Sequence, residues 1–279
     1  MSKMKKRVLS GIQPSGTLHL GNYFGMMSRM INYQDKNDLF CFIVNYHALT
    51  TIQDKNELKE NTINAALDFL ALGMDPNKST FWVQSDVPQV TELTWLLSSM
   101  AGVGLMERST SYKDKIEKGL KPHMGLFSYP ILMAADILLY GSEIVPVGKD
   151  QKQHLEITRD IAIRFNNTYG DIFVVPEADI NENNMLVPGI DGQKMSKSYG
   201  NTIPIFSDEK TIRKAVMSIT TDSAGINDPK DKDTPLFKIY CMFLNNDEKN
   251  ILSDRYDTPG LRYGDLKKAL CEKIIEYFS

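Results

Sequence analysis

The chain has 279 residues, of which 42% are hydrophobic and 24% are charged, and its formal net charge is −3. This composition excludes a disordered chain and predicts about two globular domains of roughly 150 residues each. The slightly negative charge excludes a general nucleic-acid binder, so we expect no contact with DNA, and contact with RNA needs a local basic patch.

The first predicted element is a strand that leads through a loop into a helix, within residues 7–27. The apolar pair Val8 and Leu9 predicts the strand, and a loop rich in glycine and proline passes His19 before the helix begins. Such a junction favours an anion, because the unpaired N–H groups and the dipole of the helix both point toward it. The segment fits neither the dinucleotide fingerprint nor the P-loop. An ordinary turn with an incidental histidine is the alternative.

A strand, a helix and a second strand follow, which together predict a βαβ unit of a doubly wound parallel sheet. The apolar run at 39–49 predicts a buried strand, 57–72 a helix and 81–83 the next strand. Because ligands bind at the carboxyl ends of parallel strands, His47 at the end of the first run is a candidate pocket residue. A structural histidine is an equal alternative.

The next segment predicts an apolar helix at 89–104, followed by a polar stretch rich in lysine. We expect Trp95 on this helix to pack in the core or against a second subunit. The lysines of the polar stretch form either a solvated surface or a segment that reaches phosphates.

An apolar helix at 129–140 contains one carboxylate, Asp136. A buried charge is costly unless it is paired, so Asp136 accepts a hydrogen bond from a ligand or pairs with a nearby cation. A strand at 144–147 then leads into a helix at 151–165, whose His154 we interpret as a structural or surface residue.

Strands are predicted at 171–177 and 185–187, followed by a turn and a loop that contains Lys194 and Lys197. Two lysines three residues apart in a loop with glycine and serine suit closure over a polyphosphate, and a solvated basic loop is the alternative. Beyond 204 only helices are predicted. We therefore expect a Rossmann-like α/β domain at 1–204, with a helical insert at about 89–125, and an all-helical domain at 205–279.

Two motifs together carry a family resemblance. The HLGN element that begins at His19 and the KMSKS loop that begins at Lys194 resemble the paired signatures of class I aminoacyl-tRNA synthetases. Further segments are similar to the bacterial-type tryptophanyl-tRNA synthetases, and the similarity covers essentially the whole chain: GIQPSG at 11–16, YP at 129–130, MAADIL at 133–138, VPVG at 145–148 and DQKQH at 150–154. Tyrosine-specific relatives typically carry Gln-x-x-Asp where this chain has Met133 and Asp136.

The resemblance implies ATP-dependent activation of L-tryptophan, followed by transfer to the 3′ end of tRNA(Trp), by a cytoplasmic homodimer. It implies that the helical domain binds the tRNA anticodon. It also implies that Mg²⁺ enters with ATP and that the protein itself holds no metal. The implied tryptophan-binding residues are Asp136, which accepts the indole N–H, Tyr129, Met133, Gln151, His47, Val44 and Ile137. The implied ATP-binding residues are Gln13, Pro14, Ser15, Gly21, Asn22, Gly148, Lys149, Asp150, Lys194, Met195, Ser196, Lys197 and Ser198. The implied catalytic residues are Lys115, Lys194, Lys197 and His19.

Some residues depart from the family pattern or leave alternatives open. Lys149 stands where many relatives have an acidic residue, and Asn45 and Tyr46 replace the usual Asp-Gln before the histidine. A tyrosine-specific synthetase and a non-catalytic tRNA-binding paralogue are the alternatives, and a nucleotidyltransferase of this fold would lack the helical extension. The three cysteines are an odd number without C-x-x-C spacing, so we expect neither a disulfide framework nor a zinc ribbon. Some relatives in the family bind an iron–sulfur cluster through four C-terminal cysteines, and since only Cys241 and Cys271 stand there in this chain, we expect no cluster. The final helix shows no C-cap signal, so the chain is expected to continue beyond Ser279.

Overall fold

The computed structural model describes residues 5–14, 16–109, 112, 117, 119, 121–148, 151–180 and 186–279, and the chain divides into two compact units. Unit 1 comprises Met1–Gly16 and Met30–Asn184, and unit 2 comprises Thr17–Arg29 and Met185–Ser279. The sequence places the domain boundary at 204, whereas the structure groups the segment before it with the helices. Main-chain hydrogen bonds explain the grouping, because Leu20 N–H donates to Ile203 O and Ile205 N–H donates to Leu18 O.

Unit 1 is built on a five-stranded sheet in which every pair of neighbouring strands is parallel. The strands are β1 (Arg7–Ile12), β2 (Asp38–Ile43), β3 (Ser79–Val83), β4 (Ile144–Val147) and β5 (Glu177–Ile180). Their order is β3-β2-β1-β4-β5, so the direction of winding reverses between β1 and β4. The predicted doubly wound, Rossmann-like sheet is confirmed.

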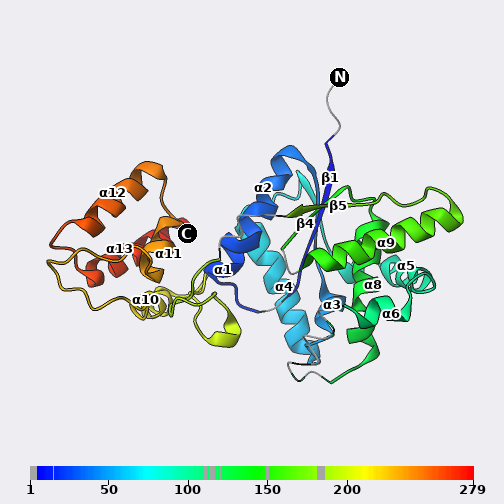
Figure 1. The fold of residues 1–279 in the computed structure, drawn as a ribbon, viewed down its shortest axis with the longest axis horizontal. Helices are drawn as coiled ribbons and strands as arrows, with labels where there is room; N and C mark the ends of the chain where they lie inside the picture. Colours follow the sequence, from blue (N-terminus) through cyan, green and yellow to red (C-terminus); the bar gives the residue numbers. More distant parts are fainter. Residues whose placement is uncertain are drawn as a thin grey trace. The chain divides into compact units, whose positions relative to one another are not determined.

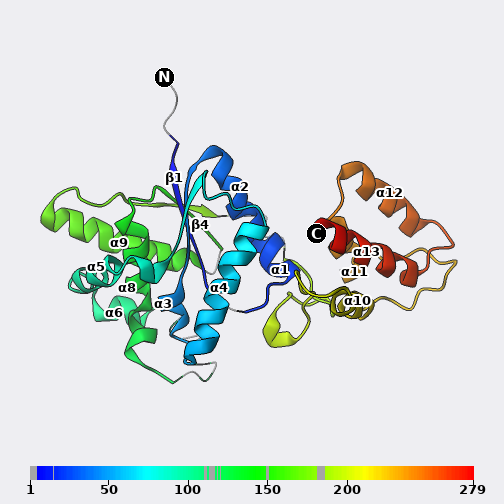
Figure 2. The same cartoon turned by 180° about the vertical axis from the view of Figure 1, so that it is seen from behind.

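Helices cover both faces of this sheet. They are α2 (Ser28–Lys36), α3 (Asn45–Ala48), α4 (Lys55–Ala71), α5 (Gln89–Ser98), α6 (Val103–Glu107), α8 (Met124–Leu139) and α9 (Lys152–Tyr169). The part of α2 in unit 1 and α4 lie on one side, and α8 and α9 lie on the other with α5 and α6 outside them (Figures 1 and 2). Helix α8 is apolar along most of its length because Ile131, Ala134 and Leu138 pack into a cluster with α5 and α9. In the ranges that the structure describes, no helix is both long and apolar enough to cross a membrane.

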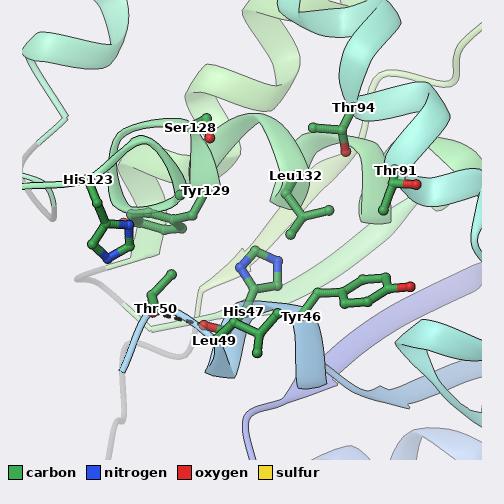
Figure 3. Close-up of a pocket in the computed structure, with 11 residues that line it drawn as sticks. Tyr46, His47, Leu49, Thr50, Thr91, Thr94, His123, Ser128, Tyr129 and Leu132 are labelled. Carbon is green, nitrogen blue, oxygen red and sulfur yellow. Dashed lines mark hydrogen bonds between the residues drawn. The ribbon is translucent and has the colours of Figure 1, made fainter. Parts of the chain in front are cut away.

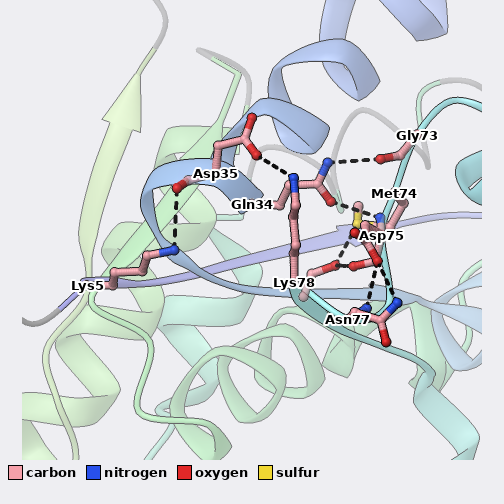
Figure 4. Close-up of polar contacts among 9 residues, drawn as sticks. Lys5, Gln34, Asp35, Gly73, Met74, Asp75, Asn77 and Lys78 are labelled. Atoms are coloured by element: carbon pink, nitrogen blue, oxygen red, sulfur yellow. Dashed lines mark hydrogen bonds and ion pairs between the residues drawn. The ribbon is translucent and has the colours of Figure 1, made fainter.

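Polar contacts join α2 to the loop that precedes β3, at the amino-terminal edge of the sheet (Figure 4). The buried Gln34 amide donates to Gly73 O at 2.9 Å and accepts from Asp75 N–H at 2.9 Å. The exposed Asp35 pairs with Lys78 at 3.1 Å, a contact worth less than about 1 kcal/mol. These contacts lie at the edge opposite to the carboxyl ends of the strands.

The strand predicted at 171–177 is wrong, because β5 begins only at Glu177. The preceding residues are bound to α9 instead. The Asn166 side chain donates to Phe173 O at 2.8 Å and accepts from the N–H groups of Ile172 and Phe173. These bonds occupy main-chain groups that a sheet would need, so the apolar run packs beside the helix.

Unit 2 is mainly helical. Its helices are α1 (Leu20–Asn22), α10 (Glu209–Met217), α11 (Pro235–Cys241), α12 (Asn246–Asp257) and α13 (Tyr263–Tyr277). A π-helical turn (Tyr23–Met27) follows α1, and its Phe24 ring packs edge-on against Phe243. The strand predicted at 185–187 is wrong for Leu186 and Val187, which belong to no strand.

Candidate active site

Residues that follow the strands of unit 1 gather at the carboxyl edge of the sheet. Gln13 follows β1, Val44 follows β2, Gln84 follows β3 and Gly148 follows β4. In a doubly wound sheet, ligands bind outside this edge at the point where the strand order reverses. The predicted positions Gln13, Val44 and Gly148 therefore share the edge at which a ligand is expected.

Asp136 of α8 forms the polar centre of this region and is only 2% exposed. His47 Nε2, from α3, lies 2.9 Å from Asp136 Oδ2. The Gln84 amide nitrogen lies 2.8 Å from Oδ1 and 2.9 Å from Oδ2. Helices α3 and α8 and the turn after β3 thus supply one connected network.

Burial raises the pKa of Asp136, whereas the hydrogen bonds from His47 and Gln84 act in the opposite direction, toward the ionised carboxylate. An ionised carboxylate only accepts, so His47 Nε2 is the donor of this contact when Asp136 is ionised. A carboxylate offers about four acceptor positions. Among the described residues, these three contacts leave Asp136 able to accept one further hydrogen bond from a buried donor.

A cavity of about 440 Å³ lies beside this network, within the range of roughly 300–1,000 Å³ that is usual for small-molecule sites. Figure 3 shows His47 and Tyr129 facing each other across it, with Leu132 above. Its lining residues are Tyr46, His47, Leu49, Thr50, Thr91, Thr94, His123, Gly125, Ser128, Tyr129 and Leu132. Two of the predicted tryptophan-binding residues, His47 and Tyr129, therefore line the cavity.

The other predicted tryptophan-binding residues lie outside the lining of this cavity. Val44, Met133 and Ile137 belong to one apolar cluster that also contains residues of β1, β2 and β4. Gln151 is exposed at the start of α9, the helix that carries His154. The sequence predicts that His154 is a structural or surface residue, and it is buried with its ring bonded to the Tyr129 hydroxyl at 2.5 Å, which excludes the surface alternative.

Gln84 is not among the site residues predicted from the sequence. This side chain is 1% exposed, donates to Asp136 and accepts from Tyr46 N–H at 3.0 Å. The available signal was its place directly after a predicted strand, the same signal that identified His47. Gln84 connects α3 and α8, so it fixes the direction of the Asp136 carboxylate.

In unit 2, the structure brings the two sequence motifs into direct contact. Gly21 N–H lies 3.2 Å from the sulfur of Met195. A Cβ atom on Gly21 would lie 2.9 Å from His19 Nδ1 and 3.2 Å from Met195 Cβ, so only glycine fits without displacement. Asn22 accepts from His19 N–H at 3.1 Å and closes the first turn.

The two motifs together contain one buried histidine and two exposed lysines. His19 is buried, and its pKa is lowered from 6.5 to about 4 by burial and by the positive charge of Lys197. His19 is therefore neutral near pH 7. Lys194 and Lys197 are exposed, and the Ser196 and Ser198 hydroxyls bond to each other at 2.8 Å. The arrangement places the positive charge of Lys197 near a neutral imidazole.

Four predicted site residues lie outside the described residues: Ser15, Lys115, Lys149 and Asp150. Pro14, by contrast, is described and buried directly after β1. For these four positions the assignment remains that of the sequence resemblance.

The family model, the curated relatives and the solved structures that match this chain agree with one another. The model of the family "tRNA synthetases class I (W and Y)" matches residues 1–279. The tryptophan--tRNA ligase of Fusobacterium nucleatum is 55% identical over 274 residues, which cover 98% of this chain and 84% of that protein. The tryptophanyl-tRNA synthetase of Campylobacter jejuni, in complex with ADP and tryptophan, aligns with a TM-score of 0.93 at 55% identity, over 98% of this chain and 86% of that one. The enzyme of Mycoplasma pneumoniae aligns with a TM-score of 0.81 at 32% identity, over 99% of this chain and 86% of that one.

Proposed function

This chain belongs to the class I tRNA synthetases for tryptophan and tyrosine, and we propose that it activates L-tryptophan with ATP and transfers it to the 3′ end of tRNA(Trp). In the first step the tryptophan carboxylate attacks the α-phosphate of ATP, which forms tryptophanyl-adenylate and releases pyrophosphate. In the second step a ribose hydroxyl of the terminal adenosine attacks the carbonyl carbon of this anhydride and releases AMP.

The proposed specificity for tryptophan rests on one observation, the buried Asp136 that can accept one further hydrogen bond. Asp136 accepts the indole N–H, and a site built around a buried acceptor rejects an analogue that leaves it unpaired, such as phenylalanine. Met133, Val44 and Ile137 supply apolar contacts to the ring from their common cluster. Tyr129 and Gln151 bind the ammonium and carboxylate groups, and His47 holds Asp136 in place.

Nucleotide-binding residues are proposed in each unit, taken by itself. In unit 1 these are residues 13–15 after β1 and 148–150 after β4, as the sequence resemblance implies. In unit 2 these are His19, Gly21, Asn22 and the KMSKS loop. Neither chemical step needs a covalent enzyme intermediate, so positioning and charge stabilisation carry catalysis, with Lys115, Lys194 and Lys197 on the leaving pyrophosphate.

We propose that Mg²⁺ reaches the site with the phosphates of ATP. Over the described ranges, no group of three or more His, Cys, Asp or Glu side chains is arranged to hold a metal ion. Mg²⁺ commonly binds substrate phosphates and waters with few protein ligands. When bound, the ion neutralises charge on the leaving pyrophosphate.

The remaining assignments concern partners. We propose a cytoplasmic homodimer whose interface includes α5, because Trp95 is 78% exposed and Leu96 beside it is 50% exposed. The helices of unit 2 from α10 to α13 would contact the tRNA anticodon.

The experiment that tests the proposed function is ATP–pyrophosphate exchange with tryptophan and tyrosine side by side. We expect exchange that depends on tryptophan, with tyrosine giving a rate close to that without amino acid. Exchange with tyrosine alone would assign the other specificity of the family, and no exchange with either amino acid would favour the non-catalytic paralogue.

A further inference from the structure

Asn201, three residues beyond the KMSKS loop, makes three side-chain hydrogen bonds to the segment that contains the loop. Its Oδ1 accepts from Ser196 N–H at 2.8 Å. Its Nδ2 donates to Asp191 Oδ1 at 2.8 Å and to Lys194 O at 3.1 Å. Both amide hydrogens are therefore in use, and the residue is only 2% exposed. A buried and fully bonded amide has one orientation, because any rotation would leave a buried polar group unpaired.

The main chain around Asn201 is also closely packed. Ile190 N–H donates to Asn201 O at 3.0 Å. A Cβ atom added to Gly189 would lie 2.3 Å from Asn201 Nδ2 and 2.8 Å from Asn201 O, so the two residues approach as closely as glycine allows. The asparagine is thus closely packed at both its side-chain amide and its main-chain carbonyl.

These contacts fix the main chain next to both motif lysines. Asn201 binds the carbonyl of Lys194 and the N–H of the residue before Lys197, while both lysine side chains are exposed. Met195, between them, is buried and contacts Gly21. The loop therefore has an inner side that is anchored and an outer side that carries positive charge.

We propose that Asn201 is a positioning residue, which orients Lys194 and Lys197 for their action on the phosphates of ATP. This inference rests on the proposed function. A reaction catalysed by positioned charges is sensitive to small displacements, and an error of about 1 Å can lower the rate roughly a hundredfold. Asn201 acts through the main chain of the lysines and touches no reacting atom.

The test compares Asn201→Ala and Asn201→Asp in tryptophan-dependent pyrophosphate exchange. We expect kcat to fall roughly tenfold to a hundredfold, with a higher KM for ATP and a KM for tryptophan within about twofold of the wild type. Asn201→Asp replaces the donor that faces Asp191 with a second carboxylate. The same substitution turns the donor toward Lys194 O into an acceptor, so Asn201→Asp should lose at least as much rate as Asn201→Ala.

Asn166→Ala is the matched control, because Asn166 also makes three hydrogen bonds to a neighbouring segment, in unit 1. It should lower the melting temperature and leave the kinetic constants unchanged. If Asn201→Ala behaves like this control, or if its losses in kcat/KM for ATP and for tryptophan are equal, the positioning role is overturned. The wild type distinguishes the two proposals: absence of exchange in the wild type refutes the proposed function, whereas an active wild type with fully active Asn201 variants refutes only this inference.

Discussion

The amide nitrogen of Gln84 lies 2.8 Å from one carboxylate oxygen of Asp136 and 2.9 Å from the other. The two residues are 52 positions apart in the chain, and both are buried. A donor shared by both oxygens holds the carboxylate plane in one orientation. The direction of the remaining acceptor position is therefore set by Gln84 as well as by His47.

Gln84→Ala should raise the KM for tryptophan about tenfold, because a hydrogen bond to a charged group contributes about 1.5–3 kcal/mol. The KM for ATP should stay the same. Gln34→Ala is the control, since Gln34 is also a buried glutamine whose amide bonds to main chain at both ends. Steady-state pyrophosphate exchange measures both constants. A KM for tryptophan that is unchanged in Gln84→Ala would show that Asp136 is oriented without Gln84.

Lys194→Ala and Lys197→Ala should each lower the rate of tryptophanyl-adenylate formation far more than the affinity for tryptophan. Both side chains are exposed and carry the positive charge of the loop, so their removal leaves the Asp136 network intact. We expect a loss of at least about a hundredfold in the rate, as for other groups that stabilise transition-state charge. Pre-steady-state kinetics separates the two quantities, and equal losses in rate and affinity would refute the assignment.

The sequence predicts those parts of the site that follow from local pattern. His47 ends an apolar run, and Asp136 is the one carboxylate in an apolar helix, so each is visible within a short segment. The contact of Gln84 with Asp136 depends on how β3 and α8 pack, which no local pattern encodes. The strand prediction at 171–177 is wrong for a related reason. The Asn166 side chain bonds to main-chain groups of this apolar run that would otherwise bond to a neighbouring strand.

Gly21→Ala should lower kcat strongly, because the new methyl group would lie 2.9 Å from His19 Nδ1 and 3.2 Å from Met195 Cβ. His19 or Met195 must then move, which disturbs the contact between the two motifs. We expect at least about a tenfold loss in exchange rate with little change in the KM for tryptophan. Gly25→Ala is the control, since nothing lies within 4 Å of the methyl group it would add. Equal activity of the two variants would contradict the steric argument.

The stability of the protein should depend on pH through His19. Burial and the charge of Lys197 lower its pKa from 6.5 to about 4, so the unfolded chain binds a proton more readily than the folded chain between these values. The free energy of unfolding therefore decreases as the pH falls from about 6.5 to about 4, by up to about 3 kcal/mol from this residue. Above pH 6.5 the histidine is neutral in both states and adds no pH dependence.

His19→Gln removes this titration, so its stability should decline less steeply than that of the wild type across the same interval. Urea unfolding of both proteins at a series of pH values from 4 to 7 gives the comparison, because every other titrating group is shared. Lys197→Ala removes the smaller cause of the shift, so the loss of stability should be smaller and should end at a higher pH, closer to 6.5. Parallel curves for the wild type and His19→Gln would mean that the His19 ring becomes protonated in the folded protein at no cost, which its burial makes physically unfavourable.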